Sequence, residues 1–188
     1  KQYYFCSDCE QLFGTWEQAF SETIFVPLHN SGSKPVSFKY QDWCLKFAAS
    51  VSWRVLLFHK LRGLTHLSSE QIELANRAFD IWRDFLRGNR PHPDKFEQHI
   101  LPLDMIESHS FPNLSPYINR YFLRGIDCDV IRSETTVMAY TKMCRIALFG
   151  FIQFDEKNKW RGTKVHIREG KIGAKKYYIT IKIVYGVK

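Results

Sequence analysis

The chain has 188 residues, of which 45% are hydrophobic and 15% aromatic, and its formal net charge at pH 7 is +8. This composition excludes an intrinsically disordered chain, and no apolar run approaches the roughly 20 residues of a bilayer-spanning helix. We expect one globular domain with, at most, a small appendage. Five cysteines without a regular pairing pattern favour a reducing, cytoplasmic environment over a disulfide framework.

Residues 8–26 predict the first helix, because their apolar side chains recur at helical spacing and form one stripe. Asp8 and Glu10 lie in the first turn, where the positive end of the helix dipole favours acidic side chains. Pro27 has no backbone N–H to donate, so we expect the helix to stop before it.

Two further helices complete the predicted helical half. Residues 40–61 are apolar on most sides, which indicates a helix at the centre of the domain, and Gly63 provides an end signal. A third helix is expected to start at Ser68, whose hydroxyl can form a capping box with Gln71. Gly88 then ends it.

The second half carries the patterns of β-strands. Residues 96–105 are ambiguous, and we interpret them as a strand because Pro102 disfavours a long helix. Apolar and acidic residues alternate over residues 126–130, as in a half-buried strand. Further strands are expected over 137–142, 144–154, 163–173 and 177–186. The sequence therefore predicts an α+β fold, in which a helical first half of three main helices packs on a C-terminal antiparallel β-meander.

Cys6 and Cys9 form a Cys-x-x-Cys pair at the entrance of the first helix. A structural zinc site needs four ligands, and a helix N-terminus helps to hold thiolates. The chain has no second pair of this kind. We therefore expect Zn²⁺ bound by Cys6 and Cys9 and completed by residues outside this chain, from an upstream segment or a partner chain. A redox pair, or two unligated cysteines packed at the helix start, are alternatives.

The string FCSDCEQLF resembles the closing segment of HNH endonucleases, in which a cysteine pair opens the last helix of a ββα-metal unit. A wider resemblance covers most of the chain and links it to a group of poorly characterised bacterial proteins. Those proteins carry an upstream half with another cysteine pair and a His-containing hairpin. The strings that carry this resemblance are YYFCSDCEQLFGTWEQAFSETIFVPLHN, LKFAASVSWRVL, RPHPDKFEQHILPLDMIESHS and NRYFLRGIDCDV.

The resemblance implies a role for three residues. Cys6 and Cys9 match the zinc pair, and Glu10 stands where HNH nucleases often have the His or Asn that helps to hold the catalytic metal. A glutamate oxygen can bind Mg²⁺ or Mn²⁺. The sequence departs from the pattern because KQYYF lacks the middle Asn, and the general-base His belongs to the upstream hairpin.

Two functions from different classes follow. The first is an HNH-like metal-dependent nuclease, or a degenerate relative that still binds DNA or RNA. The second is a non-catalytic, zinc-stabilised protein–protein interaction module. Under either, residues 1–30 form the cysteine knuckle with the opening helix, and residues 36–188 form an α+β body with a basic, β-rich C-terminal segment.

The positive charge is concentrated at the C-terminal end. Residues 157–188 contain ten Lys or Arg and one acid, which amounts to +9, whereas the whole chain carries +8. Cations interleaved with aromatic rings suit phosphate contact and base stacking, although a solvated β-hairpin has the same composition. The residues expected to contact nucleic acid are Lys159, Trp160, Arg161, Lys164, Arg168, Lys175 and Lys176.

Three weaker candidates remain. Asp127 and Asp129 form an Asp-x-Asp pair that could bind a divalent cation, but such pairs are more often the solvent face of an edge strand. Arg54 in the apolar helix predicts a buried cation with an acidic partner. Three histidines, interspersed with acids, are further metal-ligand candidates: His92, His99 and His109.

Overall fold

The computed structural model describes residues 5–31, 37–103, 117–155, 160 and 162–173. The fold is α+β, as predicted, with three main helices in the first half packed on a four-stranded antiparallel sheet. The helices are α1 (Ser7–Phe20), a π-helical turn η1 (Ser21–Phe25), α2 (Val26–Asn30), α3 (Trp43–Arg62), α4 (Ser69–Leu86) and α5 (Ile118–Arg124). The strands are β1 (Ser37–Tyr40), β2 (Gln98–Pro102), β3 (Ile126–Arg132), β4 (Thr136–Met143), β5 (Ile146–Phe154) and β6 (Gly170–Gly173).

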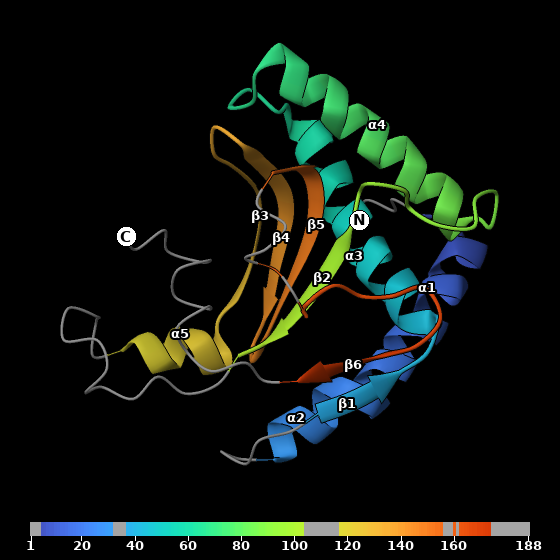
Figure 1. Ribbon diagram of the computed structural model, residues 1–188, viewed down its shortest axis with the longest axis vertical. Helices are drawn as coiled ribbons and strands as arrows, with labels where there is room; N and C mark the ends of the chain where they lie inside the picture. The colour runs from blue at the N-terminus through green and yellow to red at the C-terminus, as the bar shows by residue number, and fades with distance from the viewer. Residues whose placement is uncertain (1–4, 32–36, 104–116, 156–159, 161, 174–188) are drawn as a thin grey trace.

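Helix α3 is the central element of the fold. It lies between the four-stranded sheet on one side and α1 and α4 on the other (Figure 1). Its side chains are buried around most of its circumference, in agreement with the apolar pattern of the sequence. Phe47 stacks on Phe20 of the first helical stretch with ring centroids 3.9 Å apart, while Leu56 packs with Trp82 of α4 in a second cluster.

The main sheet has the strand order β2-β5-β4-β3. Strands β3, β4 and β5 form the expected meander, and β2 joins it along β5, with Gln98 opposite Gly150. The interpretation of residues 96–105 as a strand is thus confirmed for Gln98–Pro102. Residues 104–105 and the predicted strand at 177–186 lie outside the described residues.

Strand β6 is not part of the meander. Of the predicted strand 163–173, only Gly170–Gly173 is a strand, and it pairs with β1 in a separate two-stranded ribbon. The ribbon places Phe38 opposite Ile172, and both side chains are buried. The sequence did not predict β1, because four residues after a glycine- and serine-rich stretch carry too short a pattern to be recognised.

The prediction that Pro27 ends the first helical stretch is wrong. The chain passes from α1 through η1 into α2 and remains helical to Asn30. Pro27 occupies the first turn of α2, where a missing backbone N–H removes no bond within that helix. The π-helical turn before it shifts the hydrogen-bond register by one residue, which lets a proline follow without breaking the helix.

The expected start of the second helix at Tyr40 is wrong, because Tyr40 ends β1 and α3 begins at Trp43. The start of α4 and the ends of α3 and α4 agree with the sequence signals. The hydroxyl of Ser68 accepts from the backbone N–H of Gln71 at 3.3 Å, and the Gln71 side chain accepts from the Ser68 N–H at 3.2 Å, which completes the capping box. Gly63 and Gly88 follow α3 and α4 with φ of +88° and +78°, a region that favours glycine.

Residues 126–130 form the predicted strand, but the prediction that the strand is half-buried is wrong. Only Val130 of β3 is buried, and Ile126 is 78% exposed. Strand β3 is the edge of the sheet among the described strands, and α3 covers only part of its face. Alternation in sequence therefore identified the strand, while its position at the edge determined the burial.

Gly150 is required by close packing of the sheet against the helices. A Cβ atom at this position would lie 2.5 Å from the Cβ of Ser52 on α3 and 2.9 Å from the indole of Trp82 on α4. We expect Gly150→Ala to lower the free energy of unfolding by about 2–3 kcal/mol, because neither neighbour can move without opening the core. Urea denaturation measures the change.

Gly14 in α1 provides the matched control, since a Cβ there meets no atom within 4 Å. Gly14→Ala should stabilise the protein by about 0.5–1 kcal/mol through the higher helix propensity of alanine. Equal unfolding free energies for Gly150→Ala and the parent protein would contradict the packing argument.

Candidate functional site

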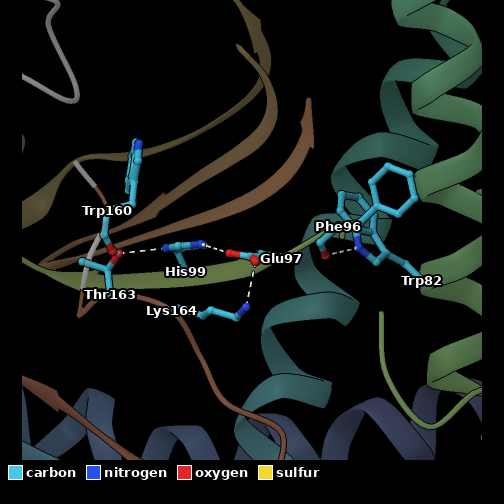
Figure 2. Close-up of polar contacts among 7 residues, drawn as sticks. All are labelled: Trp82, Phe96, Glu97, His99, Trp160, Thr163 and Lys164. Atoms are coloured by element: carbon cyan, nitrogen blue, oxygen red, sulfur yellow. Dashed lines mark hydrogen bonds and ion pairs between the residues drawn. The ribbon is translucent and has the colours of Figure 1, made fainter. Parts of the chain in front are cut away.

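A polar network joins β2 to a segment more than sixty residues later in the chain. Residues 163–165 run beside β2: Ile100 N–H donates to the Thr163 carbonyl at 3.0 Å, and Val165 N–H donates to the Gln98 carbonyl at 2.9 Å. Figure 2 shows the side chains that this alignment brings together. The imidazole of His99 lies between Thr163 and Glu97, and the Lys164 ammonium reaches the same carboxylate.

The distances define a chain of hydrogen bonds. His99 Nδ1 is 2.8 Å from Thr163 Oγ1, and Nε2 is 3.3 Å from Glu97 Oε2. The Thr163 hydroxyl can donate to Nδ1 or to the carbonyl of Trp160, which is 2.7 Å away and also accepts the Thr163 backbone N–H. We assign the hydroxyl proton to Nδ1, so that Nε2–H donates to the Glu97 carboxylate and every group is satisfied. Lys164 completes the chain with a 2.7 Å bond to Oε1.

Burial sets the protonation of this network. It lowers the pKa of His99 to about 4, and the opposing effect of the Glu97 carboxylate is smaller. Burial acts to raise the pKa of Glu97, but hydrogen bonding and charge from Lys164, together with His99, outweigh it, so that the pKa lies below its usual value. At neutral pH the pair is therefore a neutral imidazole and a carboxylate.

The order of hydroxyl, imidazole and carboxylate is that of a hydrolase triad, but the geometry does not support nucleophilic catalysis. Thr163 is only 3% exposed and His99 only 2%. A nucleophile has to reach a substrate atom, and the Thr163 hydroxyl is instead enclosed beside the Trp160 carbonyl. The network thus fixes residues 163–165 on β2 and presents Glu97 and Lys164 at its outer end.

A pocket of about 320 Å³ opens at this outer end. Glu97 and Lys164 line it together with the loop that precedes β2 and the segment that follows Lys164. On the loop, Asp94 contacts both Arg90 and the imidazole of His92. The φ of Asp94 is +51°, an uncommon value for a residue with a side chain. The pocket therefore combines ionic pairs with a strained loop.

The predicted zinc pair, Cys6 and Cys9, lies near the N-terminus of the chain, at the start of α1. Cys6 is the N-cap residue and is exposed, and Cys9 is half-buried against the core cluster that contains Phe13. Hydrogen bonding from the backbone and side chain of Cys9 lowers the pKa of Cys6, and the same side-chain interaction raises the pKa of Cys9. The two thiols thus influence each other's protonation, and the Cys6 thiol is exposed to solvent.

Glu10 is exposed in the first turn of α1, and its backbone N–H donates to the Cys6 carbonyl at 3.1 Å. Within the described residues, no group of three or more His, Cys, Asp or Glu is placed to hold a metal ion. The zinc role of Cys6 and Cys9 and the metal role of Glu10 accordingly remain predictions. The chemistry of two neighbouring thiols, one exposed and one half-buried, fits two corners of a tetrahedral zinc site.

The basic segment is only partly described. Trp160 is 6% exposed and packs edge-to-face on Phe149 and Phe151, so the prediction that its ring stacks on a base is wrong. The pattern of aromatic residues and cations could not separate a core tryptophan from a surface one. Lys164 pairs with Glu97, and Arg168 is exposed. Four other predicted contacts lie outside the described residues: Lys159, Arg161, Lys175 and Lys176.

The weaker candidates separate in space. Arg54 has the acidic partner expected for it, Glu17 at 2.7 Å, but the pair is part-exposed rather than buried. His92 lies on the exposed loop, whereas His99 is buried in β2; His109 lies outside the described residues. Asp127 and Asp129 are both exposed on the edge strand.

The sequence did not identify Glu97 and Lys164 as a pair. They are 67 positions apart, and neither carries a local signal that points to the other. The sequence indicated only that Glu97 and His99, two positions apart in a predicted strand, would share one face of that strand.

The fold and these two sites define an α+β protein with two cysteines at the start of its first helix and a polar pocket beside β2. No protein-family model, curated protein or solved structure matches the chain. Among the described helices, none has the length and apolar character that crossing a membrane requires.

Acidification should destabilise the protein through His99. The unfolded imidazole titrates near its ordinary pKa of 6.5 and the folded one near 4, so the unfolded state binds more protons between these values. Stability is fully present above pH 6.5 and falls as the pH drops towards 4, by on the order of 3 kcal/mol. Urea unfolding at pH 7.5 and 4.5 measures the loss.

His99→Gln removes this titration and should reduce the difference between the two pH values. An acid-induced loss of the same size in parent protein and His99→Gln would refute the assignment.

Proposed function

We propose that this chain is the zinc-binding and substrate-binding part of an HNH-like protein that acts on or holds nucleic acid. The observation that carries the proposal is the position of the two thiols at the start of α1, with Cys6 exposed at the N-cap position and Cys9 partly exposed one turn later. Two thiolates at a helix N-terminus suit Zn²⁺, and the zinc would fasten α1 to the segment that supplies the other two ligands.

The remaining ligands come, in this proposal, from an upstream segment or a partner chain. The resemblance to HNH endonucleases supports the same division, because it assigns the second cysteine pair and the general-base His to an upstream half. In this proposal Glu10 is the residue of this chain that helps to hold a catalytic Mg²⁺ or Mn²⁺ through its carboxylate. Its exposure leaves the carboxylate free of the core.

The charge distribution supports DNA or RNA as the partner. The C-terminal 32 residues contribute an excess of positive charge, and Arg168 of this segment is exposed. A protein with free cysteines and this partner class fits the cytoplasm, which we propose as its compartment.

The zinc assignment is tested by metal analysis of protein made from the complete gene. We expect about one structural Zn²⁺ per chain attributable to this site, lost in Cys6→Ser and in Cys9→Ser because each removes one of four ligands. Cys128→Ser is the matched control, since Cys128 is also an exposed cysteine. Equal zinc content in the parent protein and the Cys6→Ser/Cys9→Ser double variant would refute the site.

Nucleic-acid binding is tested by its salt dependence. Replacing Lys175 and Lys176 by Gln should weaken binding and reduce the slope of log K against log salt by about 2, because each phosphate contact contributes roughly one unit. The control is Lys39→Gln/Arg77→Gln, which removes the same charge from two exposed positions outside the C-terminal segment. Identical slopes in the two double variants would argue against the basic segment as the contact.

A second candidate is the non-catalytic, zinc-stabilised interaction module. One observation favours it: Trp160 and Lys164, two of the predicted nucleic-acid contacts, are engaged in contacts within the protein. Nuclease assays with Mg²⁺ or Mn²⁺ and binding assays with DNA and RNA separate the two. Zinc binding without cleavage and without salt-dependent binding would leave the interaction module.

A further inference from the structure

The pocket beside Glu97 has the composition of a ligand site. At about 320 Å³ it lies at the lower end of the range of roughly 300–1,000 Å³ typical of ligand pockets, so it has room for one ring system. Its walls include apolar groups from three segments, Leu45 of α3, Pro93 of the loop before β2, and Val165 with Ile167. A few polar groups are set among them, which is the usual arrangement at a small-molecule site.

The polar groups form one edge with a defined order of acceptors and donors. Each oxygen of Glu97 accepts one bond, from His99 on one side and from Lys164 on the other. A carboxylate oxygen has two lone pairs, so both oxygens keep acceptor capacity. The ammonium of Lys164 uses one of its three donors on Glu97 and is 45% exposed. Two acceptors thus stand next to one donor.

The position of this edge is fixed before any ligand arrives. His99 is almost fully buried and holds the carboxylate from below, and the bonds of residues 163–165 to β2 hold the Lys164 backbone. A preorganised edge loses little conformational freedom on binding, which favours affinity. The buried imidazole therefore positions the carboxylate rather than acting on a substrate itself.

The charges restrict the ligand class. Glu97 pairs with Lys164, and Asp94 pairs with Arg90, so each carboxylate at the pocket already has a cationic partner. A charged ligand would lose its hydration among the apolar walls, and no unpaired opposite charge among the described residues of the pocket would compensate for that loss. A neutral, flat ring with a hydrogen-bonding edge loses much less.

We propose that this pocket binds a guanine base. The Watson–Crick edge of guanine presents, in order, the N2–H donor, the N1–H donor and the O6 acceptor. The two oxygens of Glu97 match the donors, and the Lys164 ammonium matches O6. Adenine, cytosine and uracil each lack two adjacent donors on this edge. The apolar side chains that line the pocket would contact the faces of the ring.

The guanine belongs either to a free nucleotide or to an unstacked position of a single strand. The second source deepens the proposed function and rests on it, whereas the first is independent of it. Recognition of a splayed-out base by its Watson–Crick edge is the usual mode of sequence-specific single-strand binding.

The first experiment uses the full chain without substitution. Titration with GMP, AMP, CMP and UMP at pH 7.5 should show GMP binding at least about tenfold more tightly than the others, since a bidentate base contact discriminates by that order. Equal affinity for the four nucleotides, or no measurable GMP binding, would overturn the proposal. This readout requires no variant to fold.

Two variants then locate the site. Glu97→Gln replaces one acceptor by a donor that opposes the guanine N–H groups, and Lys164→Met removes the donor to O6; each should weaken GMP binding about tenfold or more. The matched controls, Glu73→Gln and Lys39→Met, alter exposed positions on α4 and β1 and should not change it. GMP affinity that is unchanged in Lys164→Met would overturn the assignment, because that side chain is part-exposed and its loss leaves the core intact.

A short single-stranded oligonucleotide with one guanine distinguishes the sources. Guanine-dependent binding of the oligonucleotide supports a strand as the ligand, and binding of GMP alone supports a free nucleotide. Failure of the pocket and failure of the proposed function also differ. Salt-dependent strand binding with no GMP binding overturns only the pocket, whereas GMP binding with no strand binding leaves the pocket and removes the nucleic-acid function.

Discussion

The burial of α3 on most of its surface is the constraint on which the rest of the structure depends. This helix packs against the sheet on one side and against α1 and α4 on the other, so its sequence is apolar on nearly all sides (Figure 1). Its packing requires a glycine at position 150, because Ser52 and Trp82 leave no room for a Cβ. The same packing holds β2 against β5, and β2 carries the polar network.

In the polar network, a buried residue determines the orientation and hydrogen bonding of a residue at the pocket. Enclosing His99 makes its imidazole neutral, and its hydrogen bonds then orient Glu97 toward the pocket. The identity of the neighbouring loop matters equally, since the backbone bonds of residues 163–165 bring Lys164 to the carboxylate. The thiol pair at α1 depends on no such long-range contact. Cys6 and Cys9 are three residues apart, so the first turn of the helix alone brings them near each other.

Local signals were sufficient for most of the fold. The capping box at Ser68, the glycine after α4 and the strands of the meander are decided by residues close in sequence, and all agree with the structure. The errors have one cause, which is that a local rule was applied where neighbours decide. Pro27 is accommodated by the π turn before it, and Trp160 is buried by strands that a sequence pattern does not place.

The sequence by itself determined the α+β class, the central helix and the adjacency of Cys6 and Cys9, because these follow from periodicity and from spacing within one helical turn. Only the tertiary structure decided that β1 pairs with β6, that His99 is buried and that Glu97 meets Lys164. Those contacts join residues tens of positions apart, and their energy depends on burial and distance, which no local pattern records.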